Sequence, residues 1–148
     1  MYQHEFVAGM GDFDFDGRYR GAACLDRAGD VRMAYFGDHG FPVAIFRQQR
    51  FMPLLLKDKL DYQRDIQPFE RYRVSLTLAG LSVDGSRFVL RCDLIRSDGK
   101  TAAKVGSTCG WLDSNLQKLV VPPPQLIALL KELPMSSDYQ NLQSAIKQ

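Results

Sequence analysis

The feature that most constrains the fold is a change of hydrophobic pattern after Met52, beyond which apolar and polar residues alternate in four successive segments. Alternation with a period of two is typical of β-strands with one buried face. The last three segments are joined by VDGS (83–86) and SDGK (97–100), and Asp-Gly between alternating runs is a strong hairpin signal. The pattern therefore predicts an antiparallel sheet ending in a three-stranded meander. The four segments are residues 53–66, 71–83, 86–96 and 100–113.

The residues before this sheet are predicted to contain one long helix over 17–36, because that segment lacks proline and is rich in helix-forming residues. Gly21 and Gly29 are unusual in it, since each costs about 1 kcal/mol relative to alanine inside a helix. Together with neighbouring alanines, they indicate that another part of the molecule approaches this helix closely. A short strand is predicted at 2–8, and a second, short helix from near Pro42, because proline suits the first turn of a helix.

This order of elements is typical of an α+β fold in which one sheet packs against one helix. We interpret residues 1–134 as a single domain, closed by a short amphipathic helix that begins near Pro124. Residues 135–148 are mostly polar and are predicted to form a loosely held C-terminal tail. One helix cannot cover the whole face and both edges of such a sheet, so a partner subunit is expected.

The composition argues against several classes of protein. The net charge of +2 is too small to suggest a nucleic-acid-binding surface, and no apolar run approaches the roughly 18 residues that a membrane span needs. Cys24, Cys92 and Cys109 show no spacing typical of a disulfide framework or of a zinc site. Unpaired thiols and an N-terminus without signal-peptide features predict a cytoplasmic protein with no metal or other cofactor.

The segment DFDFDG (12–17) places three aspartates directly before the predicted helix. Aspartate is a favoured N-cap, worth about 1 kcal/mol, so Asp16 is interpreted as the helix cap and Asp12 as a structural residue. A carboxylate can also act as a nucleophile or as a general base, so the residues alone leave Asp14 open between a structural and a catalytic role.

This acidic segment and the helix after it resemble the opening motif of hotdog-fold acyl-CoA thioesterases of the 4-hydroxybenzoyl-CoA thioesterase type. Asp12, Asp14 and Gly17 match the D-x-D-x-x-G frame of that family, and DVR (30–32) stands where the family often has an acid, an alanine and an arginine. The later segment KLDYQRDIQPFERYRVSLTLAG matches as well. In this segment an aromatic residue, Phe69, follows the proline, which is similar to the thioesterase-superfamily-member-6 type.

The resemblance covers about residues 5–125 and implies a hotdog fold, in which a long antiparallel sheet wraps around one central helix and the chains assemble as homodimers or homotetramers. It also implies a catalytic site in which Asp14 is the carboxylate and the backbone N–H of Gly21, at the helix N-terminus, stabilises an oxyanion. The chain departs from the family at 18–21, where RYRG replaces the family's histidine and asparagine pair.

Six basic residues are candidates for contacts with the substrate. Arg18 and Arg20 follow the acidic segment, where they could neutralise its aspartates or bind a carboxylate or phosphate of a ligand. The others surround the two Asp-Gly hairpins and could reach the phosphates of coenzyme A through charge-assisted hydrogen bonds. Alternatively, they are ordinary edge-strand charges that oppose aggregation. These four are Arg87, Arg91, Lys100 and Lys104.

The sequence leaves three functions open. The first is an acyl-CoA thioesterase that cleaves an acyl or aroyl thioester to free acid and CoA. The alternative is a non-catalytic hotdog protein that binds acyl-CoA or an acyl carrier protein, which the missing histidine and asparagine pair favours. The third is a purely structural or interaction subunit, and Asp14 argues against it because packing alone does not require that residue. No nucleic-acid or membrane partner is expected in any of the three.

Overall fold

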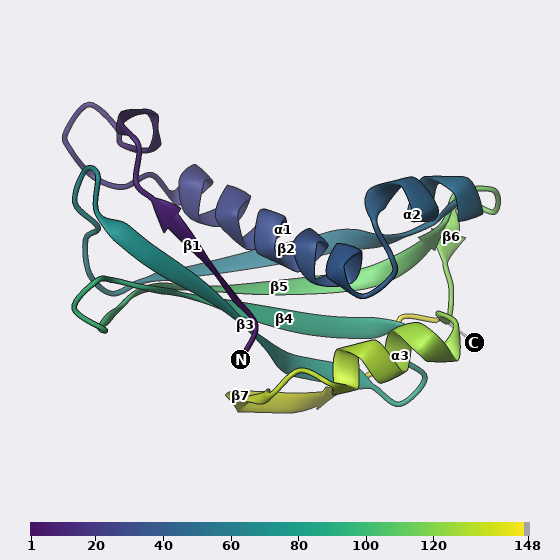
Figure 1. Ribbon diagram of the computed structural model, residues 1–148. Coiled ribbons are helices and arrows are strands. Elements are labelled where there is room, and N and C mark those ends of the chain that lie inside the picture. The colour runs from purple at the N-terminus through teal and green to yellow at the C-terminus, as the bar shows by residue number, and fades with distance from the viewer. Residues whose placement is uncertain (147–148) are drawn as a thin grey trace.

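The strands form one sheet that curls around helix α1, and the computed structural model describes residues 1–146 of the chain (Figure 1). The strand order is β1-β3-β4-β5-β2, with β6 added to β5 and β7 added to β3. All pairs are antiparallel except β3 with β7. The strands are β1 (Gln3–Val7), β2 (Phe51–Tyr62), β3 (Arg71–Ser82), β4 (Arg87–Ile95), β5 (Thr101–Asp113), β6 (Lys118–Leu119) and β7 (Met135–Leu142). The helices are α1 (Gly21–Asp38), α2 (Val43–Gln49) and α3 (Pro124–Lys131), with one 3-10 turn at Met10–Asp12.

This architecture confirms the predicted α+β class and the sheet wrapped around one central helix. The four long strands lie where the alternation placed them, and β3, β4 and β5 form the expected meander. Both Asp-Gly turns place their glycine at positive φ, +75° at Gly85 and +83° at Gly99, a conformation that favours glycine. Gly85 is doubly constrained, because a Cβ atom there would lie 2.5 Å from Ile127 Cγ1 on α3.

The face that each residue of β2 presents differs from the expectation. The pairing of β2 with β5 shifts between Leu55 and Lys57, so a bulge at Leu56 reverses the alternation. The alternation over residues 53–66 predicts that Leu56 and Leu60 share one face of the strand, and the bulge makes this prediction wrong. Beyond the bulge Asp58 lies opposite buried Ser107, and directly opposed residues of paired strands share a face. A carboxylate thus points toward the helix side of the sheet.

The long helix begins at Gly21 rather than at residue 17, because the residues before it fold into a closed loop. Its N-cap position is Arg20, and no side chain in the described part of the chain caps the helix. The interpretation of Asp16 as the cap is therefore wrong: its Oδ1 accepts a hydrogen bond from the Arg18 N–H at 3.2 Å, inside the loop. The short helix α2 begins directly after Pro42, as predicted.

The C-terminal segment is more ordered than its polar sequence predicts. Instead of a loose tail, residues 135–142 form β7, which pairs in parallel with the second half of β3. Backbone pairing supplies this order without an apolar pattern. Leu142 packs where Gly80 leaves space, since a Cβ at Gly80 would lie 3.0 Å from Leu142 Cδ2. Residues 147–148 of the predicted tail lie outside the described residues.

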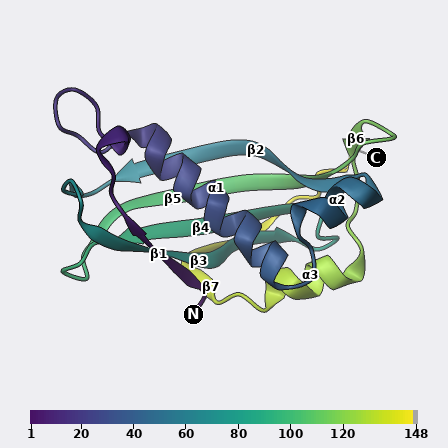
Figure 2. The same ribbon diagram turned by 45° about the horizontal axis from the view of Figure 1, so that its top comes forward.

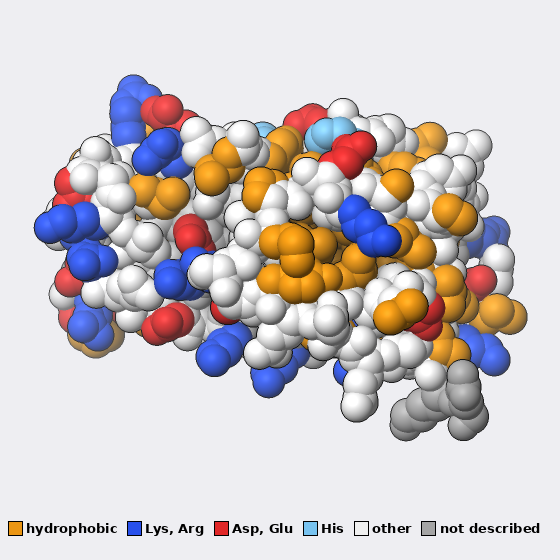
Figure 3. All heavy atoms as spheres, turned by 90° about the horizontal axis from the view of Figure 1, so that it is seen from below, with side chains coloured by type: hydrophobic (Ala, Val, Ile, Leu, Met, Phe, Trp, Pro, Cys, Tyr) orange, Lys and Arg blue, Asp and Glu red, His pale blue; other side chains and the backbone are white. Residues whose placement is uncertain are grey.

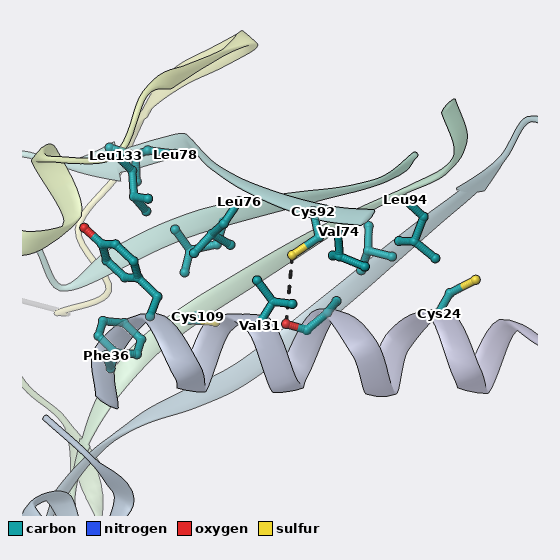
Figure 4. Packing of buried hydrophobic residues seen from close by; sticks show 14 of the residues in the cluster. Cys24, Val31, Phe36, Val74, Leu76, Leu78, Cys92, Leu94, Cys109 and Leu133 are labelled. Atoms are coloured by element: carbon teal, nitrogen blue, oxygen red, sulfur yellow. Dashed lines mark hydrogen bonds between the residues drawn. The ribbon is translucent and has the colours of Figure 1, made fainter. Parts of the chain in front are cut away.

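Helix α1 lies across the concave face of the sheet and supplies one side of the core (Figure 2). Figure 4 shows Val31 and Phe36 directed from the helix toward side chains of β3 and β4, among them Val74 and Leu76. Cys92 Sγ donates to the Ala28 carbonyl oxygen at 3.9 Å, which also joins helix and sheet. Among the described residues, no helix is both long and apolar enough to cross a membrane.

The three cysteines are free thiols buried in this core. Burial raises the pKa of both Cys24 and Cys109 to about 11. At pH 8 only about one such thiol in a thousand is ionised, and the thiolate is the reactive form. We therefore expect native protein to react far more slowly with a disulfide reagent at pH 8 than protein unfolded in guanidinium.

The same thiols make a prediction about pH and stability. Thiols of the unfolded chain ionise near pH 8.5, well below the pH at which the buried ones ionise, so folding opposes their ionisation. Their contribution to stability is complete below about pH 8.5 and is lost as the pH rises toward 11. The urea concentration at the midpoint of unfolding, compared between pH 8 and pH 10, measures this loss of stability. The midpoint should decrease less in a Cys24→Ala, Cys109→Ala variant than in the wild type. Rapid native labelling of either thiol at pH 8 would contradict the account.

Candidate active site

The acidic loop, defined as residues 9–20, is folded largely by its own backbone. The Asp14 N–H donates to the Arg18 carbonyl oxygen at 2.9 Å, and the Gly17 N–H donates to the Asp14 carbonyl oxygen at 3.0 Å. An isolated β-bridge joins Phe13 to Tyr19. Gly17 stands at the tip with a φ of +85°, which favours glycine. Asp14 is therefore presented on a tight turn, with its side chain exposed.

The carboxyl groups of Asp14 and Asp16 are drawn together by one donor. The Arg18 N–H donates to Asp14 Oδ1 at 3.0 Å and to Asp16 Oδ1 at 3.2 Å. The pKa of Asp16 lies below its usual range, first because of a hydrogen bond with Asp14 and then because of the Arg18 N–H. Asp16 therefore stays ionised beside Asp14.

Asp14 lines a cavity of about 390 Å³ between the acidic loop and the end of β2. Arginines, aspartates and tyrosines surround this space, so it can offer both hydrogen-bond donors and acceptors to a ligand. The residues that line it are Asp14, Arg18, Tyr19, Tyr62, Gln63, Arg64 and Asp65. Of the predicted site residues, Asp14 and Arg18 thus line the same cavity.

Gly21 is the first residue of α1, beside the same end of β2. A Cβ atom at this position would lie 2.9 Å from Tyr62 Oη and 3.1 Å from Leu60 Cδ2, so the close approach predicted for this glycine comes from β2. The first-turn N–H groups of a helix have no acceptor within it, and they lie at the positive end of the helix dipole. Within residues 1–146, the Gly21 N–H has no hydrogen-bond acceptor. This N–H can serve an anionic oxygen.

The other predicted basic residues are not among those that line this cavity. Arg20 Nη1 donates to the Gly11 carbonyl oxygen at 3.1 Å, which closes the acidic loop. Arg91 pairs with Asp93 at 2.8 Å and with Asp138 at 3.0 Å, and 12% of its side chain is exposed. Arg87, Lys100 and Lys104 lie on β4, the β4–β5 turn and β5, respectively. Charged side chains of both signs gather at one end of the molecule in the view of Figure 3.

Sequence reasoning missed five of the residues that line the cavity, among them Tyr62 and Arg64. Tyr62 ends β2, and its hydroxyl donates to the Tyr19 carbonyl oxygen at 3.3 Å. Burial, followed by the nearby Cys24 and Asp14 groups, raises the pKa of Tyr62, so this phenol remains a neutral donor. Arg64 follows, and its Nη1 donates to the Thr101 carbonyl oxygen at 3.0 Å. Their place at the end of a strand was visible in the sequence, but their proximity to the acidic loop was not.

A polar cluster under the middle of α1 was also missed. Arg32 Nη1 donates to Ser107 Oγ at 3.1 Å, and Ser107 Oγ donates to Asp58 Oδ1 at 2.5 Å. Ser107 is 1% exposed, so these contacts satisfy a hydroxyl that burial would otherwise leave unpaired. The sequence feature that could have revealed this cluster is Asp58, an acidic residue on the same parity of the strand as the apolar Leu60 and Tyr62. No group of acidic, histidine or cysteine side chains suited to a metal ion occurs within residues 1–146.

Comparisons with known proteins agree with this architecture. The family model described as "Thioesterase-like superfamily" matches residues 8–130. The structure is similar to a 1,4-dihydroxy-2-naphthoyl-CoA thioesterase from Synechocystis, with 14% identity, a TM-score of 0.78, and coverage of 89% of this chain and 96% of that one. It is also similar to a DHNA-CoA thioesterase from Staphylococcus aureus, with 16% identity, a TM-score of 0.78, and 88% of each chain covered.

A third similar structure is a hypothetical protein from Staphylococcus aureus solved in complex with CoA, with 16% identity and a TM-score of 0.81, covering 92% of this chain and 87% of that one. No curated protein sequence matches the chain. The solved structures support the fold, and the family model covers most of the sequence, including the acidic loop and α1. The chain belongs to the thioesterase-like superfamily.

Proposed function

We propose that the protein is an acyl-CoA thioesterase of the 4-hydroxybenzoyl-CoA thioesterase type, which hydrolyses an acyl or aroyl thioester to free acid and CoA. The observation that carries the proposal is the placement of Asp14 in a 390 Å³ cavity next to the N-terminus of α1. Two of the similar structures are named as thioesterases of an aromatic acyl-CoA, which supports an aroyl substrate here.

In the proposed reaction Asp14 acts as a general base or as a nucleophile. As a base, it takes a proton from a water whose oxygen attacks the thioester carbonyl carbon. The carbonyl oxygen becomes negative beside the Gly21 N–H and the positive end of the helix dipole. The C–S bond then breaks, and the departing sulfur takes the proton that Asp14 received from the water. As a nucleophile, Asp14 would instead attack the carbonyl carbon and displace the CoA thiolate, which takes a proton from solvent. Water then hydrolyses the resulting acyl anhydride to the free acid and the Asp14 carboxylate.

Substrate binding is proposed to use charge at two places. Arg18 lies in the cavity, where its guanidinium can bind a carboxylate or phosphate of the ligand. Arg87, Lys100 and Lys104 are proposed to meet phosphates of CoA from the surface of the sheet. Arg91 is proposed to be structural instead, because two carboxylates already occupy its guanidinium.

A second candidate function is the binding of acyl-CoA or an acyl carrier protein without hydrolysis. Arg18 and Arg20 stand where the family has its histidine and asparagine, and Arg20 is used to close the loop. No imidazole or amide side chain from these positions therefore orients a water beside Asp14.

Release of free thiol from short, long and aromatic acyl-CoAs tests both functions. Turnover above the background without enzyme supports hydrolysis and identifies the acyl class. Saturable binding of acyl-CoA without turnover supports the second candidate. Neither binding nor turnover would leave an interaction subunit as the better interpretation.

The partner is proposed to be a second copy of the chain, paired along the free edge of β2. Within residues 1–146 this 12-residue strand pairs with β5 on one side only, and Leu55 and Leu56 on it are nearly half exposed. We expect light scattering to give at least twice the 16.8 kDa chain mass. Leu55→Lys with Leu56→Lys should yield monomers. Leu116→Lys, at an exposed leucine in the β5–β6 turn, is the control, and equal masses for all three proteins would contradict the proposal.

A further inference from the structure

We propose that the buried hydroxyl pair of Tyr19 and Tyr72 is the positioning element that holds Asp14 at the cavity. The inference rests on the proposed catalytic role of Asp14. Tyr19 is the penultimate residue of the acidic loop, and Tyr72 lies on β3, 53 residues away. Their hydroxyl oxygens are 2.5 Å apart, and the two residues are 4% and 1% exposed.

Removing one hydroxyl of this buried pair should destabilise the fold, because the other hydroxyl is then left without a partner. A buried hydroxyl without a partner loses its hydration without compensation, so each of these two needs the other. Burial, the largest influence on both, raises the pKa of Tyr19 and of Tyr72, so both phenols stay neutral. The contact is therefore a hydrogen bond between uncharged groups at every pH at which the protein would be assayed.

The position of Tyr19 determines the position of Asp14 through short backbone contacts. Tyr19 is joined to Phe13 by a β-bridge, and the Phe13 ring meets the Tyr19 ring edge-on at 5.4 Å between centroids. Asp14 follows Phe13, and its N–H is bonded to Arg18, the neighbour of Tyr19. Tyr19 also lines the cavity. A shift of Tyr19 would therefore move both Asp14 and the wall beside it.

The part of the acidic loop that precedes Asp14 is attached separately, to helix α1. Asp12 Oδ1 pairs with Arg27 Nη2 at 3.4 Å, and Asp12 Oδ2 accepts from the Gly9 N–H at 3.0 Å. The Arg27 guanidinium lies 5.6 Å from the centre of the Phe6 ring on β1. These contacts confirm Asp12 as a structural residue. Asp14 thus lies between two attached parts of the loop. Of these two, the part that contains Tyr19 is attached through the buried core.

The test compares Tyr72→Phe with Tyr35→Phe. Tyr35 is an equally buried tyrosine, 3% exposed, whose hydroxyl donates to the Leu129 carbonyl oxygen at 2.5 Å near the other end of α1. Each variant deletes one buried hydroxyl and leaves one partner unsatisfied, so both should lower the melting temperature. Only Tyr72→Phe should lower kcat, by about tenfold or more with KM changed less than about threefold, because a small misplacement of a catalytic group is costly.

The double variant Tyr19→Phe, Tyr72→Phe separates positioning from stability. It leaves no unpaired hydroxyl, so the melting temperature should recover toward that of the wild type. The attachment is still missing, so kcat should stay low. Recovery of kcat together with stability would overturn the proposal, as would an equal decrease of kcat in Tyr72→Phe and Tyr35→Phe.

Hydrogen exchange of the acidic loop gives a readout that does not depend on activity. The amides of Asp14 and Gly17 are hydrogen bonded within the loop, so they should exchange about tenfold faster in Tyr72→Phe but not in Tyr35→Phe. If the wild type hydrolyses no thioester, the proposed function fails, and the exchange rates still decide whether this pair holds the loop. Equal protection in all variants would reject the positioning role even if Asp14 proves catalytic.

Discussion

Replacing Asp14 by asparagine is expected to reduce acyl-CoA turnover by at least about a hundredfold, the scale of a positioned acid–base group. An amide has the shape of the carboxyl group but neither takes a proton from water nor attacks a carbonyl carbon. Its oxygen can still accept the Arg18 N–H, which lies 3.0 Å from Asp14 Oδ1, so the loop should persist. Thiol release measures the rate, and an unchanged melting temperature verifies the fold.

The matched control is Asp16→Asn. Asp16 lies in the same loop and accepts a hydrogen bond from the same N–H, but it does not line the cavity. Its replacement removes an equal charge two residues away and should change turnover less than about threefold, since the proton acceptor remains. Similar rates for wild type and Asp14→Asn would show that Asp14 is not the catalyst. That result would favour the function of binding acyl thioesters without hydrolysis.

Replacing Trp111 by alanine is expected to lower the free energy of unfolding by about 3–5 kcal/mol. Trp111 lies on β5 and is fully buried in an aromatic cluster at the α2 end of the sheet. Its ring stacks on Phe51 at 5.3 Å between centroids and lies 5.0 Å from the ring of Phe88. Its Nε1–H also donates to the Gly85 carbonyl oxygen at 3.1 Å. Alanine would leave a large cavity and an unpaired carbonyl oxygen.

Urea unfolding followed by circular dichroism measures this change, because Trp111 is the only tryptophan and fluorescence would be lost. Trp111→Phe serves as the comparison, since it retains most of the ring but removes the N–H donor. We expect it to cost about 1–3 kcal/mol, the range for an unsatisfied buried group. A loss below about 1 kcal/mol in Trp111→Ala would show that the cluster collapses around the cavity or is not close-packed.

The long strands were predictable because their alternation and their Asp-Gly turns are local signals. The bulge at Leu56 was not, since it depends on how β2 pairs with β5, and it reversed the expected face of the residues before it. Strand β7 was missed for a related reason. Its sequence is polar, and its order comes from backbone hydrogen bonds to β3, which no side-chain pattern reports.

The candidate site was only partly visible in the sequence. Asp14 was singled out by its resemblance to a family motif, and neither periodicity nor spacing distinguished it from Asp16. Asp16 was wrongly assigned as the helix cap because capping preferences use only the neighbouring residues. In the structure the loop folds back through the bridge between Phe13 and Tyr19 before the helix starts. The contact of Tyr19 with Tyr72 spans 53 residues and exists only once β3 is in place.

Strands β1 and β7, from the two ends of the chain, together form one border of the sheet. Strand β1 pairs with residues 71–75 of β3 and β7 pairs with residues 78–82, in opposite directions, so this border consists of two short pieces. Short, interrupted borders are poor templates for further strands. The opposite border is the 12-residue β2, whose register shifts once, at Leu56. Pairing of two chains along β2, as proposed above, would leave only the interrupted borders at the two sides of the joined sheet, which favours a closed pair of chains and disfavours a fibre.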